Sequence, residues 1–203
     1  MERAKRREET RRRIIDSATD LVEQHGFDHI TVDDICAEAG ISRRTFFNYM
    51  ESKDEAVLGP APLTVTDDAL QRIAVTQADN VVALIIAETS VTDAEKPDRG
   101  TLERRRRIFA ANPSLANIAL ARRRATLTAI ANALEEHFER YPGDRLIPDR
   151  PAVAEIHAIV ELIQNAVSIS AFNPEFSDPD LDLRDNVRSA AAFITDLARK
   201  LEW

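Results

Sequence analysis

The stretch GISRRTFFNYMESK, residues 40–53, decides how the N-terminal part of this chain is expected to fold. Gly40 can adopt the left-handed conformation that ends a helix, and Ser42 can cap the helix that follows. Before it, Thr31 offers a cap for the short segment VDDICAEA, residues 32–39. Two short helices joined by a tight glycine-containing turn form a helix-turn-helix, and a longer helix over residues 10–25 can complete its core.

The chain as a whole is acidic, with a formal net charge of -8, although this stretch is basic. Charges are screened over roughly 8–10 Å at ordinary ionic strength, so the local potential decides whether the stretch can bind nucleic acid. The N-terminal arm is also basic, and we expect it either to lie along a DNA backbone or to be a solvated, solubilising tail. Its cations are Arg3, Lys5, Arg6, Arg7, Arg11, Arg12 and Arg13.

Composition excludes several other classes of protein. Only five glycines occur and no segment alternates apolar and polar residues, which predicts an all-α fold. Cys36 is the single cysteine and the histidines show no metal-ligand spacing with it, so we expect no disulfide, metal or other cofactor. No apolar run reaches about 18 residues and no secretory signal is present, which predicts a cytoplasmic protein without a membrane span. No catalytic constellation stands out, so an enzyme is not expected.

Residues 14–58, IIDSATDLVEQHGFDHITVDDICAEAGISRRTFFNYMESKDEAVL, resemble the DNA-binding domain of the TetR family of transcriptional regulators. The resemblance rests on the threonine that opens the second helix, AGIS at the turn, TF in the recognition helix and SK at the start of the next helix. It implies a regulator, most often a homodimeric repressor, that binds a palindromic double-stranded operator. The sequence departs from the family pattern at Phe47, where tyrosine is usual, and at Met50, where phenylalanine is usual.

The residues expected to contact DNA lie mainly in the second helix of the motif. Arg43 and Arg44 occupy its first turn, which a helix-turn-helix places against base edges, where arginine can pair with guanine. The alternatives are solvated surface charges, or one arginine on a phosphate. The resemblance implies that Thr31, Tyr49 and Lys53 contact phosphates. The complete expected set is Thr31, Ser42, Arg43, Arg44, Thr45, Asn48, Tyr49 and Lys53.

Two prolines, Pro60 and Pro62, forbid a continuous helix after the motif and predict a domain boundary. We therefore expect an arm and helix-turn-helix domain over residues 1–58, followed by a helical effector-binding and dimerisation domain over residues 59–203. Helices in the second domain are expected over residues 67–75, 79–92, 99–112, 113–140, 151–172 and 182–202.

The last two of these helices carry apolar stripes that can serve either of two purposes. They can face the core of their own domain, or they can form the two-fold four-helix dimer that the resemblance implies. The residues expected at a dimer interface are Val153, Ile156, Val160, Ile163, Val167, Val187, Ala190, Ala191, Ile194, Leu197 and Leu201.

The middle helices of the second domain are expected to enclose a cavity for an unknown small apolar or amphipathic effector, whose binding releases the DNA. The alternatives are a regulator or adaptor without an effector, and an activator. The arginine runs within residues 103–124 are expected to be solvated faces, or else to meet a phosphate-bearing ligand. Candidate lining residues, for which plain core is the alternative, are Leu84, Ile85, Phe109, Leu115, Ile118, Leu134, Phe138, His157 and Phe172.

Overall fold

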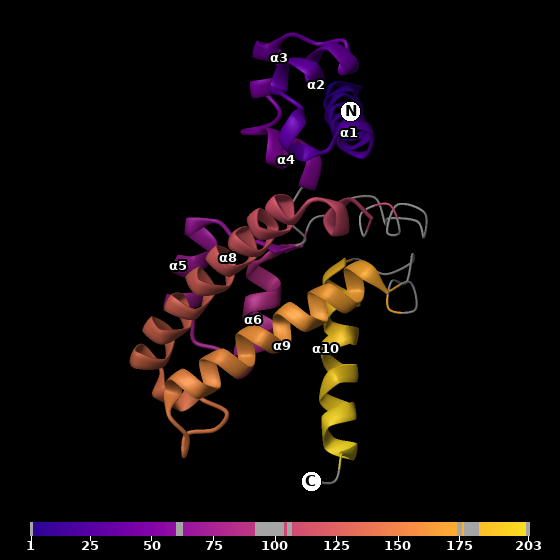
Figure 1. Ribbon diagram of the computed structural model, residues 1–203. Coiled ribbons are helices and arrows are strands. Elements are labelled where there is room, and N and C mark those ends of the chain that lie inside the picture. Colours follow the sequence, from indigo (N-terminus) through magenta and orange to yellow (C-terminus); the bar gives the residue numbers. More distant parts are fainter. Residues whose placement is uncertain are drawn as a thin grey trace. The chain divides into compact units, whose positions relative to one another are not determined.

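The computed structural model describes residues 2–59, 63–91, 104, 107–173, 176 and 183–201 (Figure 1). Within these ranges, the side chains of residues 2–5, 90, 91, 171, 172 and 183 lie outside the description. The chain divides into two compact units, the first made of residues 1–60 and 98–121 and the second of residues 61–97 and 122–203. This division differs from the expected one, because residues 98–121 return to the first unit after the second has begun.

Short helices follow one long helix in the first unit. They are α1 (Glu2–His25), the 3-10 helix η1 (Phe27–His29), α2 (Val32–Ala39), α3 (Arg43–Phe47) and α4 (Lys53–Leu58). The first helix begins well before residue 10, because the arginines and glutamates of the expected arm favour a helix and neither glycine nor proline interrupts them. Residues 107–111 are also helical, whereas most of the helix expected over residues 99–112 lies outside the described residues.

The helix ends in the first unit follow the expected capping chemistry. Thr31 accepts a hydrogen bond from the Asp34 amide and Ser42 accepts one from the Thr45 amide, so both predicted N-caps are confirmed. Gly40 ends α2 with φ 64°, a conformation that only glycine adopts without strain. These caps fix the turn between α2 and α3 by local hydrogen bonds.

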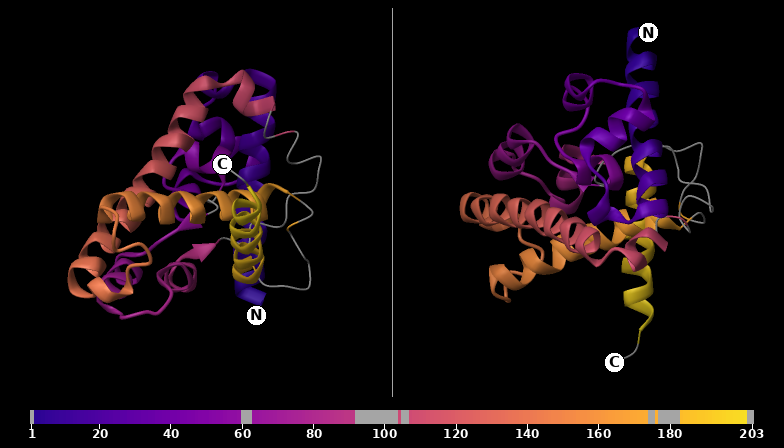
Figure 2. Two further views of the ribbon diagram at one scale, coloured as in Figure 1. Left: turned by 90° about the horizontal axis from the view of Figure 1, so that it is seen from below. Right: turned by 45° about the horizontal axis from the view of Figure 1, so that its top comes forward.

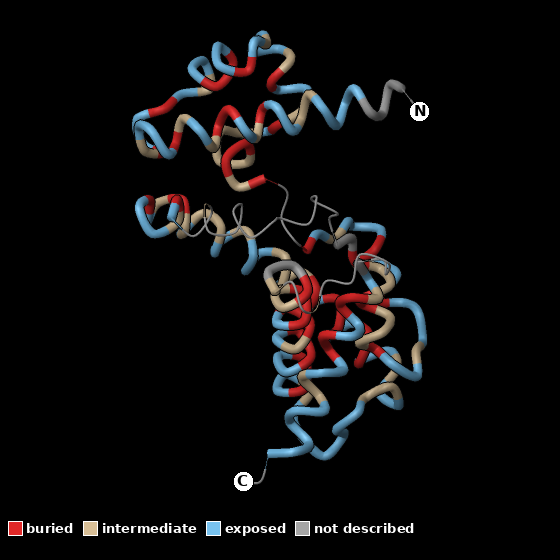
Figure 3. The backbone as a smooth tube through the Cα atoms, turned by 90° about the vertical axis from the view of Figure 1, so that its right-hand side faces the viewer, coloured by how far each residue is buried: buried red, intermediate tan, exposed pale blue. Residues whose placement is uncertain are grey.

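The core of the first unit is built from both of its chain segments (Figure 3). Cys36 lies buried within it, and burial raises the pKa of the thiol, as expected for a cysteine that acts as a small apolar residue. The buried residues are Ile14, Ala18, Val22, Phe27, Ile30, Ile35, Cys36, Ala39, Phe46, Met50, Ala56, Val57, Ile108 and Leu115.

The second unit is also mainly helical, which confirms the all-α prediction. Its elements are β1 (Leu63–Thr64), α5 (Asp67–Val75), α6 (Val81–Glu88), β2 (Ser90–Val91), most of α8 (Pro113–Arg140), η2 (Pro142–Asp144), α9 (Ala152–Phe172) and α10 (Leu183–Lys200). The sequence did not predict the antiparallel pairing of β1 with β2, in which Leu63 faces Val91. Strands this short show no alternation of apolar and polar residues.

Helices α9 and α10 pack against each other, and α10 crosses α9 near the end of α9 (Figure 2). Most of the residues expected at a dimer interface are buried in the core of this unit, so the alternative interpretation of the stripes accounts for them. Val153, Leu197 and Leu201 are exposed instead. The members buried in the unit's own core are Ile156, Val160, Ile163, Val167, Val187, Ala190 and Ala191, with Ile194 partly buried against it.

One helix in the described part of the chain, α9, is long and apolar enough to cross a membrane by composition alone. The stretch Ala152–Ser170 has a mean hydropathy of 1.3, which corrects the expectation that no such run exists. It carries Glu155 and Glu161, and 44% of it is buried within the unit. The core helix of a soluble protein has the same properties, so this stretch is weak evidence for a membrane span.

A buried histidine and a carboxylate tie the end of α8 to the loop after α5. Nδ1 of His137 lies 2.8 Å from the Ile73 carbonyl oxygen and therefore carries a proton, because a carbonyl only accepts. Nε2 lies 3.2 Å from the Asp144 carboxylate, which also accepts a hydrogen bond of 2.8 Å from the Ala78 amide. The Ala78 amide, followed by Gln77 and His137, lowers the pKa of the Asp144 carboxyl. His137 is thus the hydrogen-bonded core histidine that its type suggests.

Replacement of this carboxylate is expected to destabilise the protein in a pH-dependent way. Because the pKa of Asp144 is lower in the folded state, its contribution to stability is present above the unfolded pKa and is lost as the pH falls through the folded pKa. Asp144→Asn should lower the melting temperature at pH 7, and the difference from wild type should shrink below about pH 4. Thermal unfolding measured by circular dichroism across this range tests it.

Asp149→Asn is the matched control, because Asp149 is exposed in the same loop. An equal loss of stability in both variants, or a difference that does not change with pH, would contradict the role of Asp144.

Candidate DNA-binding site

Helix α3 presents most of its side chains to solvent, and one buried side chain anchors it to the core. Phe46 is fully buried, which confirms that it packs inside the unit. Arg43, Arg44 and Asn48 are exposed, and half of the Phe47 side chain is exposed. The ring of Phe47 meets that of Phe46 edge to face, with centroids 5.3 Å apart. An exposed face of arginine, amide and aromatic groups therefore stands on a helix that its own core fixes.

The first arginine of α3 is held in one position by its neighbours. Nη1 of Arg43 donates to both carboxylate oxygens of Asp33 on α2, at 3.1 and 3.0 Å. Its guanidinium also lies over the Phe47 ring, 5.9 Å from the centroid. An exposed ion pair adds little stability. The ion pair instead fixes the orientation of the Arg43 guanidinium, while its other N–H groups remain available for a further contact.

The second arginine, Arg44, is in a different situation. Its side chain is exposed, and no hydrogen bond or ion pair holds it among the residues that the structure describes. Its guanidinium can therefore pair with a base edge or a phosphate without breaking an existing contact. The side chain of Arg43 has thus lost more conformational freedom than that of Arg44, although the sequence pattern does not distinguish the two.

The hydroxyl groups expected at the DNA are used in helix capping. Thr31 donates to Asp34 Oδ2 at 2.7 Å, and this hydrogen bond is the main cause that lowers the pKa of the Asp34 carboxyl. Ser42 Oγ lies 2.9 Å from Thr45 Oγ1. Such hydroxyls remain at the surface, but their first role is to shape the backbone.

The last two residues expected at the base edges or phosphates follow α3. Asn48 is exposed at the end of the helix, and Tyr49 is partly buried against the core of the first unit. Neither placement tests contact with DNA, so both remain predictions. The half-exposed Phe47 belongs to the exposed face of α3. In the sequence it stood out only because the family usually has a tyrosine at this position.

Lys53 points into the protein. Nζ donates to the Phe27 carbonyl at 2.8 Å and to the Ile30 carbonyl at 2.9 Å. It also lies 4.2 Å from the centroid of the Phe27 ring. No pattern in the sequence predicts these contacts, because they join residues that are more than twenty positions apart along the chain.

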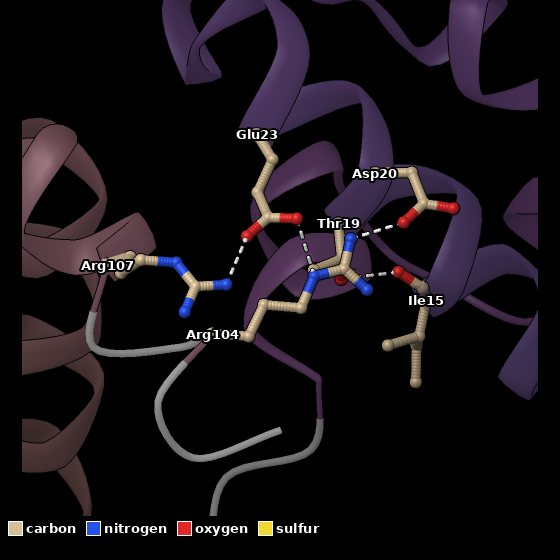
Figure 4. Close-up of polar contacts among 6 residues, drawn as sticks. All are labelled: Ile15, Thr19, Asp20, Glu23, Arg104 and Arg107. Atoms are coloured by element: carbon tan, nitrogen blue, oxygen red, sulfur yellow. Dashed lines mark hydrogen bonds and ion pairs between the residues drawn. The ribbon is translucent and has the colours of Figure 1, made fainter. Parts of the chain in front are cut away.

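The returning segment binds α1 through a group of ion pairs (Figure 4). The guanidinium of Arg104 donates to Asp20 and, at 2.8 Å, to Glu23, and Arg107 donates to the other oxygen of Glu23 at 3.3 Å. Arg104 is therefore not a purely solvated charge, and contact of the arginine runs with a phosphate-bearing ligand remains a prediction. The pairing was missed because helical periodicity shows that a residue is polar and does not show which carboxylate it meets.

A buried amide completes this attachment. Asn112 Oδ1 accepts a hydrogen bond of 2.8 Å from the Phe27 amide, and its Nδ2 donates to the Ile108 carbonyl at 2.8 Å. Ser114 donates to Asp28 at 3.2 Å in the same region. The segment is thus hydrogen-bonded to the turn that joins α1 to α2, next to the helix-turn-helix.

The residues expected to line an effector cavity are divided between the two cores. His157 is exposed on α9, Leu84 is partly buried on α6, and the Phe172 side chain lies outside the described residues. The first unit's core takes Leu115, with Phe109 and Ile118 packed against it, and the second unit's core takes Ile85, Leu134 and Phe138. Whether any of these residues contacts a ligand remains a prediction.

Removal of the Asn112 side chain is expected to destabilise the first unit. Asn112→Ala leaves the buried Phe27 N–H without its acceptor, which costs about 1–3 kcal/mol. Urea denaturation followed by circular dichroism measures the loss. Asn117→Ala, at an exposed position of α8, is the control and should change the free energy of unfolding little. A similar small change for both variants would show that the Asn112 amide is dispensable.

Comparison with known proteins supports the assignment of this unit. Residues 14–58 match the model of the bacterial regulatory proteins of the tetR family. MftR of Mycobacterium tuberculosis, named as a regulator of mycofactocin biosynthesis, is 48% identical over 50 residues. That match covers 25% of this chain and 25% of MftR, so the chain spans about a quarter of the length of this relative.

Two solved structures are similar over most of the chain. A SmeT–triclosan complex has 18% sequence identity and a TM-score of 0.49, with 93% of this chain and 90% of that chain covered. SmeT, the repressor of the Stenotrophomonas maltophilia multidrug efflux pump SmeDEF, has 16% identity and a TM-score of 0.43, with coverage of 92% and 89%. The sequence match over the helix-turn-helix is the more specific of these findings. Residues 14–58 therefore form a domain of the kind found in the bacterial regulatory proteins of the tetR family.

Proposed function

We propose that this chain is a cytoplasmic transcriptional regulator that represses its target genes by binding a palindromic operator as a homodimer. The observation that carries this function is the exposed face of α3, where Arg43 and Arg44 stand in the first turn of a helix anchored by Phe46. This end of the second helix is the one that a helix-turn-helix directs at base edges in the major groove. The family is one of regulators, in agreement with the expectation that the chain is not an enzyme.

The two arginines are proposed to have different roles. The guanidinium of Arg43, held by Asp33 and the Phe47 ring, is suited to a bidentate contact with guanine O6 and N7, which requires a defined orientation. Arg44 has no such support, and a less directional contact with a base or phosphate suits it. Asn48 and Tyr49 can add contacts beside them.

Dimerisation is proposed to use the face of α10 that the unit's own core leaves uncovered. Phe193 and Leu197 are about half exposed and four residues apart, which places them on one side of α10, and Leu201, directly after the helix, is exposed to the same extent. One helix-turn-helix contacts only a half-site, so a two-fold pair is needed to read a palindrome.

Control by a small apolar or amphipathic effector is the remaining part of the proposal. Helix α8 is one continuous helix that contributes residues up to 121 to the DNA-binding unit and later residues to the second unit. A ligand that prefers one position of this helix would therefore act on the DNA-binding unit through covalent continuity. The alternatives are a regulator or adaptor without an effector, and an activator. Thermal shift with small apolar compounds, repeated with operator DNA, separates an effector-controlled regulator from one without an effector, because linkage must be reciprocal.

The DNA-binding role is tested by selecting operators from random duplexes and measuring the affinity of variants. Arg43→Ala and Arg44→Ala should each lower the specific affinity by about 1–3 kcal/mol, and Arg43→Ala should relax the base preference at one position of each half-site. Arg140→Ala, an exposed position at the end of α8, should bind like wild type. Binding of a selected palindrome by both α3 variants with wild-type affinity would remove the basis of the proposal.

The dimer is tested by introducing a charge into the uncovered face. Leu197→Asp should produce a monomer in sedimentation velocity and weaken binding to a full palindrome more than to a half-site, because the second recognition helix is lost. Leu120→Asp is the matched control, since Leu120 on α8 is 45% exposed and Leu197 is 50% exposed. A dimer that persists in Leu197→Asp at wild-type affinity would place the interface elsewhere.

A further inference from the structure

We propose that Lys53 is a positioning residue that closes the helix-turn-helix from inside, and that it makes no contact with a DNA phosphate. The absence of a phosphate contact rests on the function proposed above, whereas the role of Lys53 in holding the helix-turn-helix does not. The proposal assigns Lys53 a role different from the phosphate contact that the resemblance implies.

The surroundings of the ammonium group already take up two of its three donors. An ammonium has three N–H groups, and two of them meet the Phe27 carbonyl at 2.8 Å and the Ile30 carbonyl at 2.9 Å. The centroid of the Phe27 ring lies 4.2 Å from Nζ, a distance typical of a cation–π contact. To reach a phosphate, Lys53 would have to abandon both carbonyls and the ring.

These contacts close a loop that contains α2 and α3. Ile30 directly precedes the cap of α2, and Lys53 is the first residue of α4, so their hydrogen bond joins the two ends of a segment of the chain. Ser52 caps α4 through a hydrogen bond of 3.2 Å from the Glu55 amide and thereby fixes the backbone from which Lys53 extends. Because the recognition helix lies between these ends, Lys53 limits how far that helix can move relative to the core.

Phe27 is also held through the peptide group on its other side. The Phe27 amide donates to Asn112 while the Phe27 carbonyl accepts from Lys53, and the Phe27 ring lies in the core beneath the ammonium. Phe27, which holds Lys53, is therefore itself attached to the segment that returns at residues 98–121. A lysine that left this position for a phosphate would loosen the turn on which the helix depends.

The first test is the stability of the protein without DNA. Lys53→Met keeps most of the apolar stem and removes the donors. Lys53→Arg keeps the charge, but a planar guanidinium cannot direct its donors at two carbonyls and a ring as the ammonium does. Both variants should lower the melting temperature by several degrees. Arg44→Met, which removes an exposed cation from the same motif, should leave it unchanged.

The second test is the salt dependence of binding to duplex DNA of mixed sequence. Each phosphate contact that is lost reduces the slope of log K against log salt by about 0.9. Lys53→Met should keep the wild-type slope, whereas Arg44→Met should reduce it if Arg44 contacts a phosphate. A slope reduced by about 0.9 in Lys53→Met, with an unchanged melting temperature and binding restored in Lys53→Arg, would overturn the proposal.

The two tests also separate failure of this inference from failure of the proposed function. If the wild-type protein does not bind duplex DNA, the regulator proposal fails, and the melting temperatures still decide the role of Lys53. If Lys53→Met does not fold, Lys53→Arg decides: a lowered melting temperature supports the positioning role, and a wild-type value contradicts it.

Discussion

The first unit depends on the double attachment of one residue, Phe27, at the turn between α1 and α2. Phe27 donates its amide to Asn112 and offers its carbonyl to Lys53, and its ring fills the core between them. Buried backbone groups need such partners, because an unpaired one costs free energy comparable to a lost hydrogen bond. Three segments far apart in the chain thereby meet at one residue, and the helix-turn-helix takes its position from that meeting point.

Beyond Phe27, the exposed face of α3 is built by short-range chemistry. Side-chain caps at Thr31, Ser42 and Ser52 set the starts of α2, α3 and α4. The Asp33 carboxylate then orients Arg43 across the gap between α2 and α3. An acidic chain can therefore carry a locally basic face: Arg43, held by Asp33, and the exposed Arg44 are adjacent in the first turn of α3, while charges farther away are screened.

The basic residues of this chain divide into groups with distinct physical roles. Arg104 and Lys53 form contacts within the unit, Arg43 is shared between a carboxylate and the surface, and Arg44 is exposed. Arg11 belongs to the first group, since it pairs with Glu55 on α4 at 3.3 Å although the sequence places it among the cations of the arm. Charge alone therefore does not identify the residues that can meet DNA.

Features that depend on neighbouring residues could be predicted from the amino-acid sequence. The capping threonine and serine, the left-handed Gly40 and the buried Phe46 follow from spacing and side-chain chemistry, and so does the all-α class. The contacts between distant groups are known from the folded structure alone: Lys53 turns inward, residues 98–121 join the first unit, and the stripes of α9 and α10 fill their own core. The physical reason is that a helical stripe shows that a face is buried but not against what, and that a charged side chain carries no local record of its partner.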